Sequence, residues 1–317
     1  MDNFEEFKER CCTCCGEQKS HTLFDLKASE ICASNWSYSS NYQKILKLEP
    51  ESCFPIVRCL PCGFIYAGLL PSEEFLRLLY DEVIDVPLAE EGSKESNNFA
   101  HRLRYVAQLP LLVPNRKTIK LLDFGSGYGI TSKMLRLIDI DVYAFDPSQS
   151  RTSIVKESDV QIIRDLDEIS QHAPFDIVVC DNVLEHVANI QEIVELFSKI
   201  IVPNGFLYVS VPSYENSFVE KLLMDQANDC LSEMSLNPWE HLNYFDLLHL
   251  DRSMADFGFI PLKQSELPEA VDIGLRPELS SIKRWQNGLM SLKRLFLYII
   301  NGSAINTVNR RFYRLIA

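Results

Sequence analysis

Long apolar runs are absent from this 317-residue chain, since none reaches the roughly 18–20 residues that a membrane-spanning helix needs. Glycine (12) and proline (15) are scarce, which excludes collagen-like and low-complexity chains. Positive charge is not in excess, because 31 Lys and Arg stand against 44 Asp and Glu. We therefore expect no transmembrane segment and no broad nucleic-acid surface. The first residues, MDNFEEFKER, lack the apolar segment of a secretory signal, so we expect a cytoplasmic protein.

Cysteine and charged residues are distributed unevenly along the chain. Eight of the ten cysteines lie in the first 62 residues, and residues 281–317 hold seven basic residues and no acid. In the middle of the chain, short apolar runs alternate with amphipathic helical patterns, which predicts a parallel α/β sheet. We expect four parts: a cysteine-rich module (1–75), a linker and helical connector (76–118), an α/β core (119–263) and a basic C-terminal extension with a short helix (264–317).

The apolar runs of the core define its expected elements. The expected strands are Ile119–Phe124, Asp141–Phe145, Val160–Ile163, Asp176–Cys180, Phe206–Val211 and Phe259–Lys263, and two of the helices between them are Ile130–Ile138 and Ile190–Ile200. A further helix is predicted to begin after Asp246, whose side chain can cap it, and to end near Gly258.

The most informative string is LLDFGSGYG, residues 121–129. Asp123 ends an apolar strand, and Gly125, Gly127 and Gly129 follow it before a helix. Such a turn presents backbone amides and a helix N-terminus to a ligand. A dinucleotide-binding loop, G-x-G-x-x-G, would need its third glycine at position 130, which is Ile130, so the spacing disfavours an NAD enzyme.

A second acid, Asp146, ends the next apolar strand, where a carboxylate can accept both hydroxyls of a ribose. The pattern D-x-G-x-G-x-G followed by this acid resembles motif I of class I S-adenosylmethionine-dependent methyltransferases. FDIVVCDNVLEHV (175–187) and IIVPNGFLYVSVP (200–212) resemble the fourth- and fifth-strand blocks of that family. The resemblance covers residues 119–262 and implies a Rossmann-like, mostly parallel seven-stranded sheet.

The same resemblance implies individual cofactor contacts. The loop around Ser126 would line the methionine moiety, Asp146 would hold the ribose, and the segment after the third strand would flank the adenine, with Asp167 as an alternative acid to Asp165. The residues implied to bind S-adenosylmethionine are Asp123, Gly125, Ser126, Gly127, Gly129, Asp146, Asp165, Leu166, Asp181 and Asn182.

The cysteine-rich module contains two C-x-x-C knuckles, which together supply the four thiolates of a tetrahedral Zn²⁺ site. CCTCC (11–15) permits two registers of the first knuckle, and RCLPCGF (58–64) holds the second. Glycine follows the last cysteine in both strings, which relieves the tight turn of a metal knuckle. That symmetry selects Cys12, Cys15, Cys59 and Cys62 as ligands. A redox pair and buried inert thiols are the alternatives.

The string IVRCLPCGFIYAGLLPSEEFLRLLYDE (56–82) is similar to the zinc-binding domain that precedes the methyltransferase domain in bacterial sugar C-methyltransferases and their uncharacterised relatives. The zinc would be structural, because four protein ligands leave no open coordination position.

Glu240 and His241, in NPWEHLNYFD, are the candidate catalytic residues. A histidine beside a glutamate suits proton removal from an acceptor, since the carboxylate can orient the ring and raise its basicity. The pair resembles the Glu–His pair placed near the sugar in the sugar C-methyltransferases. The alternative is that His241 only bonds backbone carbonyls. His186 is interpreted as a packing or supporting residue, and Tyr80 as a packing residue that could reach the pocket.

The function implied is methyl transfer from S-adenosylmethionine to a small-molecule acceptor, first a nucleotide-linked sugar or polysaccharide precursor, at oxygen or carbon. The alternatives are a non-catalytic cofactor-binding or assembly protein and a methyltransferase with a lipid-linked or macromolecular acceptor. Trp285, Leu289, Leu292, Phe296 and Ile299 recur at helical spacing. This basic amphipathic helix is expected to dock on the protein's own core, on a dimer partner or on an anionic membrane.

Overall fold

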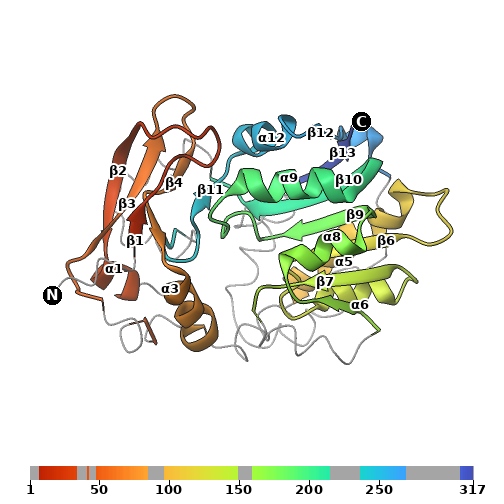
Figure 1. Ribbon diagram of the computed structural model, residues 1–317, viewed down its shortest axis with the longest axis horizontal. Helices are drawn as coiled ribbons and strands as arrows, with labels where there is room; N and C mark the ends of the chain where they lie inside the picture. The colour runs from red at the N-terminus through yellow and green to blue at the C-terminus, as the bar shows by residue number, and fades with distance from the viewer. Residues whose placement is uncertain are drawn as a thin grey trace, which may run out of the picture.

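The computed structural model describes residues 7–33, 41–42, 48–84, 96–148, 159–214, 236–268 and 308–316. A small sheet-containing module and a larger α/β core lie side by side (Figure 1). Within the described ranges no helix combines the length and apolar character of a membrane span.

The core is a seven-stranded sheet in the order β12-β13-β10-β9-β6-β7-β8. Its strands are β6 (Lys120–Phe124), β7 (Asp141–Phe145), β8 (Gln161–Ile163), β9 (Phe175–Asp181), β10 (Ile201–Pro212), β12 (Phe259–Pro261) and β13 (Val308–Leu315). β13 is antiparallel to both of its neighbours, and the pairs from β10 to β8 are parallel. The expected Rossmann-like, mostly parallel seven-stranded sheet is therefore confirmed.

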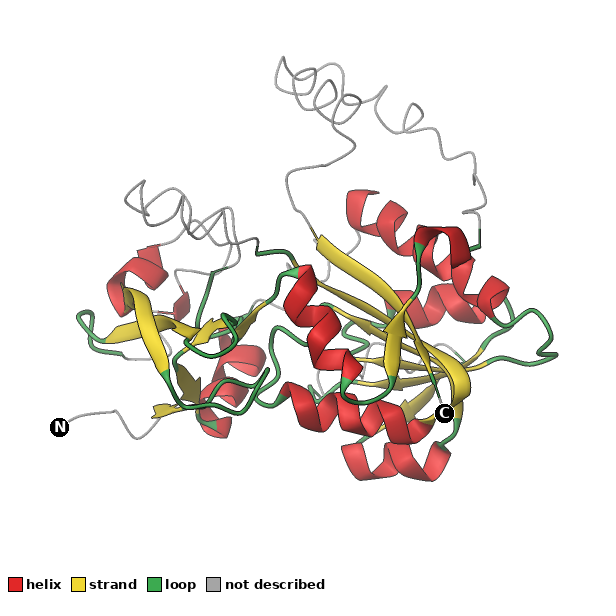
Figure 2. Ribbon diagram, turned by 90° about the horizontal axis from the view of Figure 1, so that it is seen from above, coloured by secondary structure: helices red, strands yellow, loops and turns green. Residues whose placement is uncertain are grey.

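Helices cover both faces of this sheet (Figure 2). They are α5 (Ser96–Leu112), α6 (Ile130–Arg136), α8 (Leu166–His172), α9 (Ile190–Ile200) and α12 (Leu247–Ala255), and a 3₁₀ turn follows at Gln264–Glu266. Alternate strand residues face opposite sides, so Leu121 packs with α5 and α6 whereas Leu122 packs with α8, α9 and α12. Because both faces are buried, the inner strands contain few polar residues, as the sequence indicated.

Several expected boundaries differ from the observed ones, most of them by one or two residues. β10 begins at Ile201 rather than Phe206, with an irregular register between the two, and α6 ends at Arg136 rather than Ile138. The larger difference is β13, which comes from the segment expected to be a basic extension. A core ending at residue 263 would thus omit the strand that lies between β12 and β10. The expected helix around 285–299 lies outside the described residues.

The small module has a four-stranded sheet in the order β11-β4-β3-β2. Its elements are β1 (Phe7–Glu9), β2 (Ser20–Lys27), α1 (Ala28–Ala33), β3 (Cys53–Cys59), β4 (Ile65–Ala67), β5 (Leu69–Pro71), α3 (Glu73–Leu78), a π-helical turn at Leu79–Val83, and β11 (Asn243–Tyr244). β1 pairs with β5 outside that sheet. β11 belongs to the chain between β10 and α12, so the core contributes a strand to the module and fixes the two parts together (Figure 1).

Candidate active site and metal centre

The glycine loop follows β6 at the carboxyl edge of the parallel strands. Gly125, Gly127 and Gly129 all have left-handed backbone conformations, with φ of 75°, 52° and 67°. A Cβ on Gly125 would lie 2.3 Å from a methyl carbon of Val183, so only glycine fits there. A Cβ on Gly127 would meet nothing within 4 Å, which leaves the backbone open to an approaching ligand.

Asp146 and Ser126 complete this edge of the site. The Asp146 carboxylate accepts hydrogen bonds from the amides of Gly127 (2.8 Å) and Ser148 (2.9 Å). The Ser126 hydroxyl is buried without a hydrogen-bond partner among the described residues. An open glycine backbone, an unpaired buried hydroxyl and a carboxylate at the end of β7 are the features that fit the methionine and ribose parts of S-adenosylmethionine.

Asp123 lies beneath the loop rather than on its open side. It is buried, and its carboxylate accepts a 2.5 Å hydrogen bond from the Ser132 hydroxyl on α6. Burial raises the pKa of Asp123 to about 7, although the Ser132 bond opposes that shift. Asp123 thus binds the first turn of α6 through Ser132, and this bond stabilises the glycine loop between β6 and α6.

Asp181 ends β9 beside the loop and is held by residues that the sequence did not single out. The Tyr105 hydroxyl donates to its carboxylate at 3.0 Å, and Arg102 Nε lies 3.8 Å from the same oxygen. Asn182, which follows in a left-handed conformation, donates to the other oxygen at 3.2 Å. An amphipathic pattern in α5 offers the only sequence signal for Tyr105, and it does not distinguish this tyrosine from ordinary core residues.

Asp165 and Leu166 lie at the start of α8. The Asp165 carboxylate accepts from the Glu168 amide at 2.8 Å and so caps this helix. Leu166 is 44% exposed. An exposed leucine beside the carboxyl end of β8 is compatible with an adenine lying against it.

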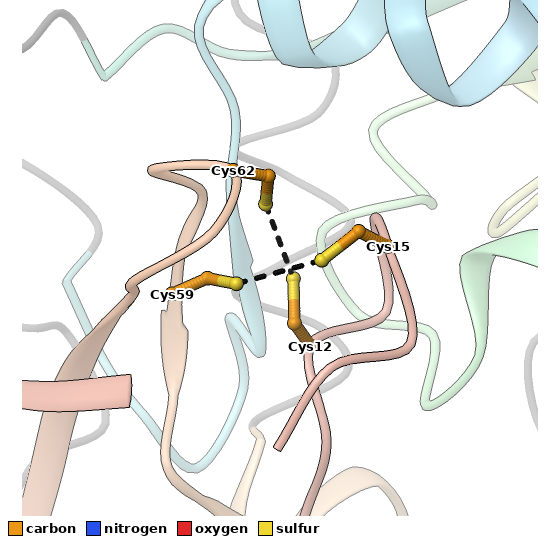
Figure 3. Close-up of side chains that lie close together, drawn as sticks. All are labelled: Cys12, Cys15, Cys59 and Cys62. Atoms are coloured by element: carbon orange, nitrogen blue, oxygen red, sulfur yellow. Dashed lines mark hydrogen bonds between the residues drawn. The ribbon is translucent and has the colours of Figure 1, made fainter. Parts of the chain in front are cut away.

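The four cysteines chosen from the glycine symmetry converge (Figure 3). Cys12 Sγ lies 3.6 Å from Cys62 Sγ, and Cys15 Sγ lies 3.5 Å from Cys59 Sγ. All four sulfur atoms are within 4.8 Å of one another.

The two knuckles have the same backbone geometry. The amide of Cys12 donates to the Glu17 carbonyl, and the amide of Gly16 donates to the Cys12 carbonyl. In the second knuckle, the amide of Cys59 donates to the Phe64 carbonyl and the amide of Gly63 donates to the Cys59 carbonyl. Both glycines are left-handed, with φ of 77° and 83°. The symmetry that selected the register in the sequence is therefore present in the backbone.

The sulfur cluster fits a tetrahedral zinc ion. A Zn–S bond of about 2.3 Å places tetrahedral sulfur atoms about 3.8 Å apart, close to the distances above. Burial raises the pKa of Cys12 and Cys59, so a thiolate at either position needs a cation nearby. His249 also connects the module to α12. Its Nε2 atom lies 2.9 Å from the Cys62 carbonyl oxygen, and its Nδ1 atom lies 2.7 Å from Asp246 Oδ1.

A second cluster lies where the turn after β9 meets the segment before β11, and it consists of Glu185, His186 and His241. One ligand-type atom of each lies within 4.8 Å of the others. Glu185 is 1% exposed, and its Oε2 is buried without a hydrogen-bond partner among the described residues. Burial raises the pKa of Glu185 well above the usual range of a carboxyl group.

The two imidazoles of this cluster are packed edge to face, with ring centroids 4.7 Å apart. His186 Nδ1 lies 2.8 Å from the backbone oxygen of Glu240 and 3.2 Å from the Tyr80 hydroxyl, while its Nε2 lies 3.8 Å from Glu185 Oε1. His241 Nδ1 lies 3.3 Å from the Tyr214 hydroxyl. Tyr80 from the module therefore contacts this cluster.

The Glu240 side chain has a different position from the expected one. Its Oε1 accepts hydrogen bonds from the Tyr42 hydroxyl and from Asn237 Nδ2, within the aromatic core of the module. The carboxylate brought close to His241 is that of Glu185. Adjacent residues in a tight turn point in different directions, which a pairing inferred from sequence neighbours does not anticipate. An acid inside the apolar string VLEHV was the available signal for Glu185.

Comparison with known proteins places the core in a family. The family model described as "Methyltransferase domain" matches residues 99–264, just over half of the chain. Ubiquinone biosynthesis O-methyltransferase from Rickettsia conorii is 30% identical over 122 residues, which are 36% of this chain and 42% of that protein. The protein of the same name from Bradyrhizobium diazoefficiens is 30% identical over 99 residues, 29% and 39% of the two chains. The chain thus spans less than half the length of these curated relatives.

Solved structures show a more distant likeness. The cyclopropane synthase MmaA2 from Mycobacterium tuberculosis matches with a TM-score of 0.45 and 15% identity, over 70% of this chain and 87% of that one. The family assignment rests on the sequence model, and the fold on the sheet described above.

Proposed function

The chain belongs to the family of methyltransferase domains, and we propose that it transfers a methyl group from S-adenosylmethionine to a small-molecule acceptor. S-adenosylmethionine is the cofactor of this family, and when bound it supplies a methyl group on a positively charged sulfur. The observation that carries the proposal is the open, left-handed glycine loop joined to Asp146 through the Gly127 amide. Such a loop, at the carboxyl edge of a parallel sheet, is built for close approach of a ribose-bearing ligand.

The residues of this chain divide into two groups in the proposed reaction. Gly125, Ser126, Gly127 and Asp146 would hold the cofactor, with Asp181 and Asn182 beneath it and Asp165 and Leu166 at the adenine. His241 would accept a proton from the acceptor as the nucleophile attacks the methyl carbon and the carbon–sulfur bond breaks. Glu185, whose pKa burial raises, would orient the neighbouring imidazole rings, since one ligand-type atom of each residue lies within 4.8 Å of the others.

The first candidate acceptor is a nucleotide-linked sugar or another polysaccharide precursor, methylated at oxygen or carbon. The basis is the similarity of residues 56–82, with Tyr80 contacting His186, to the zinc-binding domain of sugar C-methyltransferases. A ubiquinone precursor is the second candidate, favoured by the names of the curated relatives. We also assign the sulfur cluster as a structural zinc site, because four thiolates leave no open position for a substrate.

Mass spectrometry with isotope-labelled S-adenosylmethionine separates these candidates. The purified protein is incubated with a panel of nucleotide-linked sugars and, separately, with hydroxylated ubiquinone precursors, and the label is sought in the product. The Asp146→Ala variant serves as the negative control. Label in a sugar supports the first acceptor class and label in a quinone precursor the second. Failure to bind S-adenosylhomocysteine would overturn the proposed activity.

A further inference from the structure

The turn after β9 carries Glu185 and His186 and is attached to β11 by a dense set of hydrogen bonds. The backbone amides of Leu242 and Asn243 both donate to the Glu185 carbonyl, at 2.6 and 3.1 Å. The Asn243 side chain donates through Nδ2 to the carbonyls of Leu184 and Val187, each at 2.8 Å. One fully buried amide thus spans the peptide units on both sides of the Glu185–His186 pair.

The other end of the same amide reaches the cysteine knuckle. Asn243 Oδ1 accepts from the Thr13 hydroxyl and from Arg10 Nη2, both at 3.1 Å. Thr13 lies inside the first knuckle, between Cys12 and Cys15. The Asn243 side chain therefore joins the knuckle on one side to the Glu185–His186 turn on the other, with all of its hydrogen-bonding groups used.

Arg10 reinforces this link. Its guanidinium donates to the carbonyl of Leu242 at 3.3 Å and to that of Ala188 at 2.9 Å, in addition to Asn243. Burial lowers the pKa of Arg10 to about 10, so the side chain remains a cation at neutral pH. A charged donor with three acceptors on two segments holds the end of the turn in place.

We propose that Asn243 is a positioning residue that transmits the folded state of the cysteine knuckle to the Glu185–His186 turn. Metal loading of the knuckle then sets the rate of methyl transfer without contributing to cofactor binding. When the knuckle opens, the Thr13 hydroxyl leaves Asn243 Oδ1, which then keeps only the Arg10 bond, and the buried amide reorients toward that single donor. The hydrogen bonds from Asn243 Nδ2 to the carbonyls of Leu184 and Val187 are then lost, and the His186 ring changes its position.

Cofactor binding is separate because its residues are held by other bonds. Asp181 and Asn182, which precede the turn, are held by the Tyr105 hydroxyl and the Ser210 carbonyl. The amides of Gly125 and Ser126 donate to the Phe145 carbonyl, and Asp146 accepts from Gly127 and Ser148. These bonds join the carboxyl ends of β6 and β7 and involve neither the knuckle nor β11. A disturbed knuckle should therefore leave the affinity for S-adenosylhomocysteine unchanged.

The test uses Thr13→Val, which keeps the shape of threonine and removes its hydroxyl, with Thr13→Ser as the matched control that keeps it. Asn243→Asp tests the other half, since a carboxylate still accepts from Thr13 and Arg10 but cannot donate to Leu184 and Val187. For each full-length variant we would measure zinc content, S-adenosylhomocysteine affinity and the ¹⁵N imidazole resonances of His186, assigned with His186→Gln.

We expect Thr13→Val and Asn243→Asp to retain zinc and cofactor affinity but to shift the His186 resonances, while Thr13→Ser matches the wild type. Chelation of zinc from the wild type should shift the same resonances. Where an acceptor is turned over, kcat should fall by about 10- to 100-fold in the two shifted variants. Unchanged His186 resonances in Thr13→Val and Asn243→Asp would overturn the proposal.

The inference rests on the proposed function, but the two fail in different ways. Loss of S-adenosylhomocysteine binding in the wild type contradicts the proposed activity, whereas the imidazole spectra need neither an acceptor nor turnover. Loss of zinc in Thr13→Val but not in Thr13→Ser would also count against the proposal, because the hydroxyl would then act on the metal site itself.

Discussion

The Gly127 amide donates a 2.8 Å hydrogen bond to Asp146, which joins the glycine loop after β6 to the acid that ends β7. The two residues are 19 positions apart in the chain and meet because parallel neighbouring strands end at the same edge of the sheet. The same carboxylate accepts from Ser148, so its orientation is fixed before a ligand arrives. A preorganised carboxylate loses little freedom on binding a ribose.

Replacing Asp146 by alanine should therefore weaken cofactor binding. A hydrogen bond to a charged group contributes about 1.5–3 kcal/mol, so losing the ribose contacts should raise the Kd for S-adenosylhomocysteine by about 10- to 100-fold. Isothermal titration calorimetry measures this change. Asp159→Ala is the matched control, because its side chain is 96% exposed. An Asp146→Ala variant with the wild-type Kd would contradict the site assignment.

Asp123 should make stability depend on pH in the cofactor-free protein. Its folded pKa of about 7 lies above the unfolded value of 3.8, so between these limits the native state holds a proton that the unfolded chain releases. The free energy of unfolding then falls as pH rises, by at most ~1.4 kcal/mol per pH unit, and levels off above pH 7.

Asn at position 123 cannot titrate, so Asp123→Asn should lose this contribution. Urea unfolding at several pH values between 5 and 8 would show the variant gaining stability relative to the wild type as pH rises. A difference that stays constant across this range would mean that Asp123 is ionised in the native state throughout.

Local patterns in the sequence were enough to predict the elements around the cofactor site. The run before Asp123 and the helix Ile190–Ile200 were placed correctly because buried parallel strands and amphipathic helices have distinct periods. Gly16 and Gly63 indicated the four cysteines whose sulfur atoms converge, because each knuckle turn needs a left-handed residue.

What the sequence did not predict depends on contacts between distant segments. β13 carries Arg310, Arg311 and Arg314, which made it resemble a basic tail, and its partners β10 and β12 are far away in the chain. The proximity of Glu185 to His241 has the same origin, since it requires the segment before β11 to fold back on the turn after β9. The local spacing of apolar residues predicts neither arrangement.

Tyr313 tests whether β13 is a structural strand of the core. The side chain is fully buried, and its hydroxyl donates to Asp251 on α12 at 2.8 Å. Tyr313→Phe should lower the free energy of unfolding by about 1 kcal/mol through the lost hydrogen bond. Tyr313→Ala should lower it by about 3–5 kcal/mol because it leaves a cavity in the sheet face.

Denaturant unfolding measures both changes, with Ile316→Ala as the control. The Ile316 side chain is 49% exposed, so its truncation should change stability by about 0.5 kcal/mol or less. Equal stability of all three variants would show that the last strand does not contribute to the core.

The sulfur cluster predicts about one zinc per chain, lost from Cys59→Ser but kept in Cys53→Ser. These two cysteines lie at opposite ends of β3, and only Cys59 belongs to the cluster. Elemental analysis of protein purified without chelators measures the metal. Because metal binding and folding of the module form one equilibrium, Cys59→Ser should also unfold the module at a lower temperature. Protein that contains no zinc when freshly purified would contradict the assignment.

If His241 is the general base of the proposed reaction, His241→Ala should lower turnover by about 10²- to 10⁴-fold, the contribution of a positioned general base. Its affinity for S-adenosylhomocysteine should remain nearly unchanged, because the glycine loop and Asp146 lie on another segment. In the wild type, activity should rise with pH as the imidazole loses its proton, since only the neutral ring can accept one. Wild-type turnover in His241→Ala would make the residue structural.

Two glutamine variants then distinguish the carboxylates on either side of this histidine. Glu185 lies near His186 and His241, and burial raises its pKa, so the cluster holds a proton at pH values at which an exposed carboxyl group has lost it. Glu185→Gln removes the acid whose raised pKa keeps this proton in the cluster, and the pH midpoint of activity should move down. Glu240→Gln should leave the midpoint in place, because Glu240 Oε1 accepts from Tyr42 and Asn237. A downward shift in Glu240→Gln alone would restore the pairing of Glu240 with His241 that the sequence suggested. A metal equivalent beyond the structural zinc, lost only in Glu185→Gln, would instead identify the cluster as a cation site.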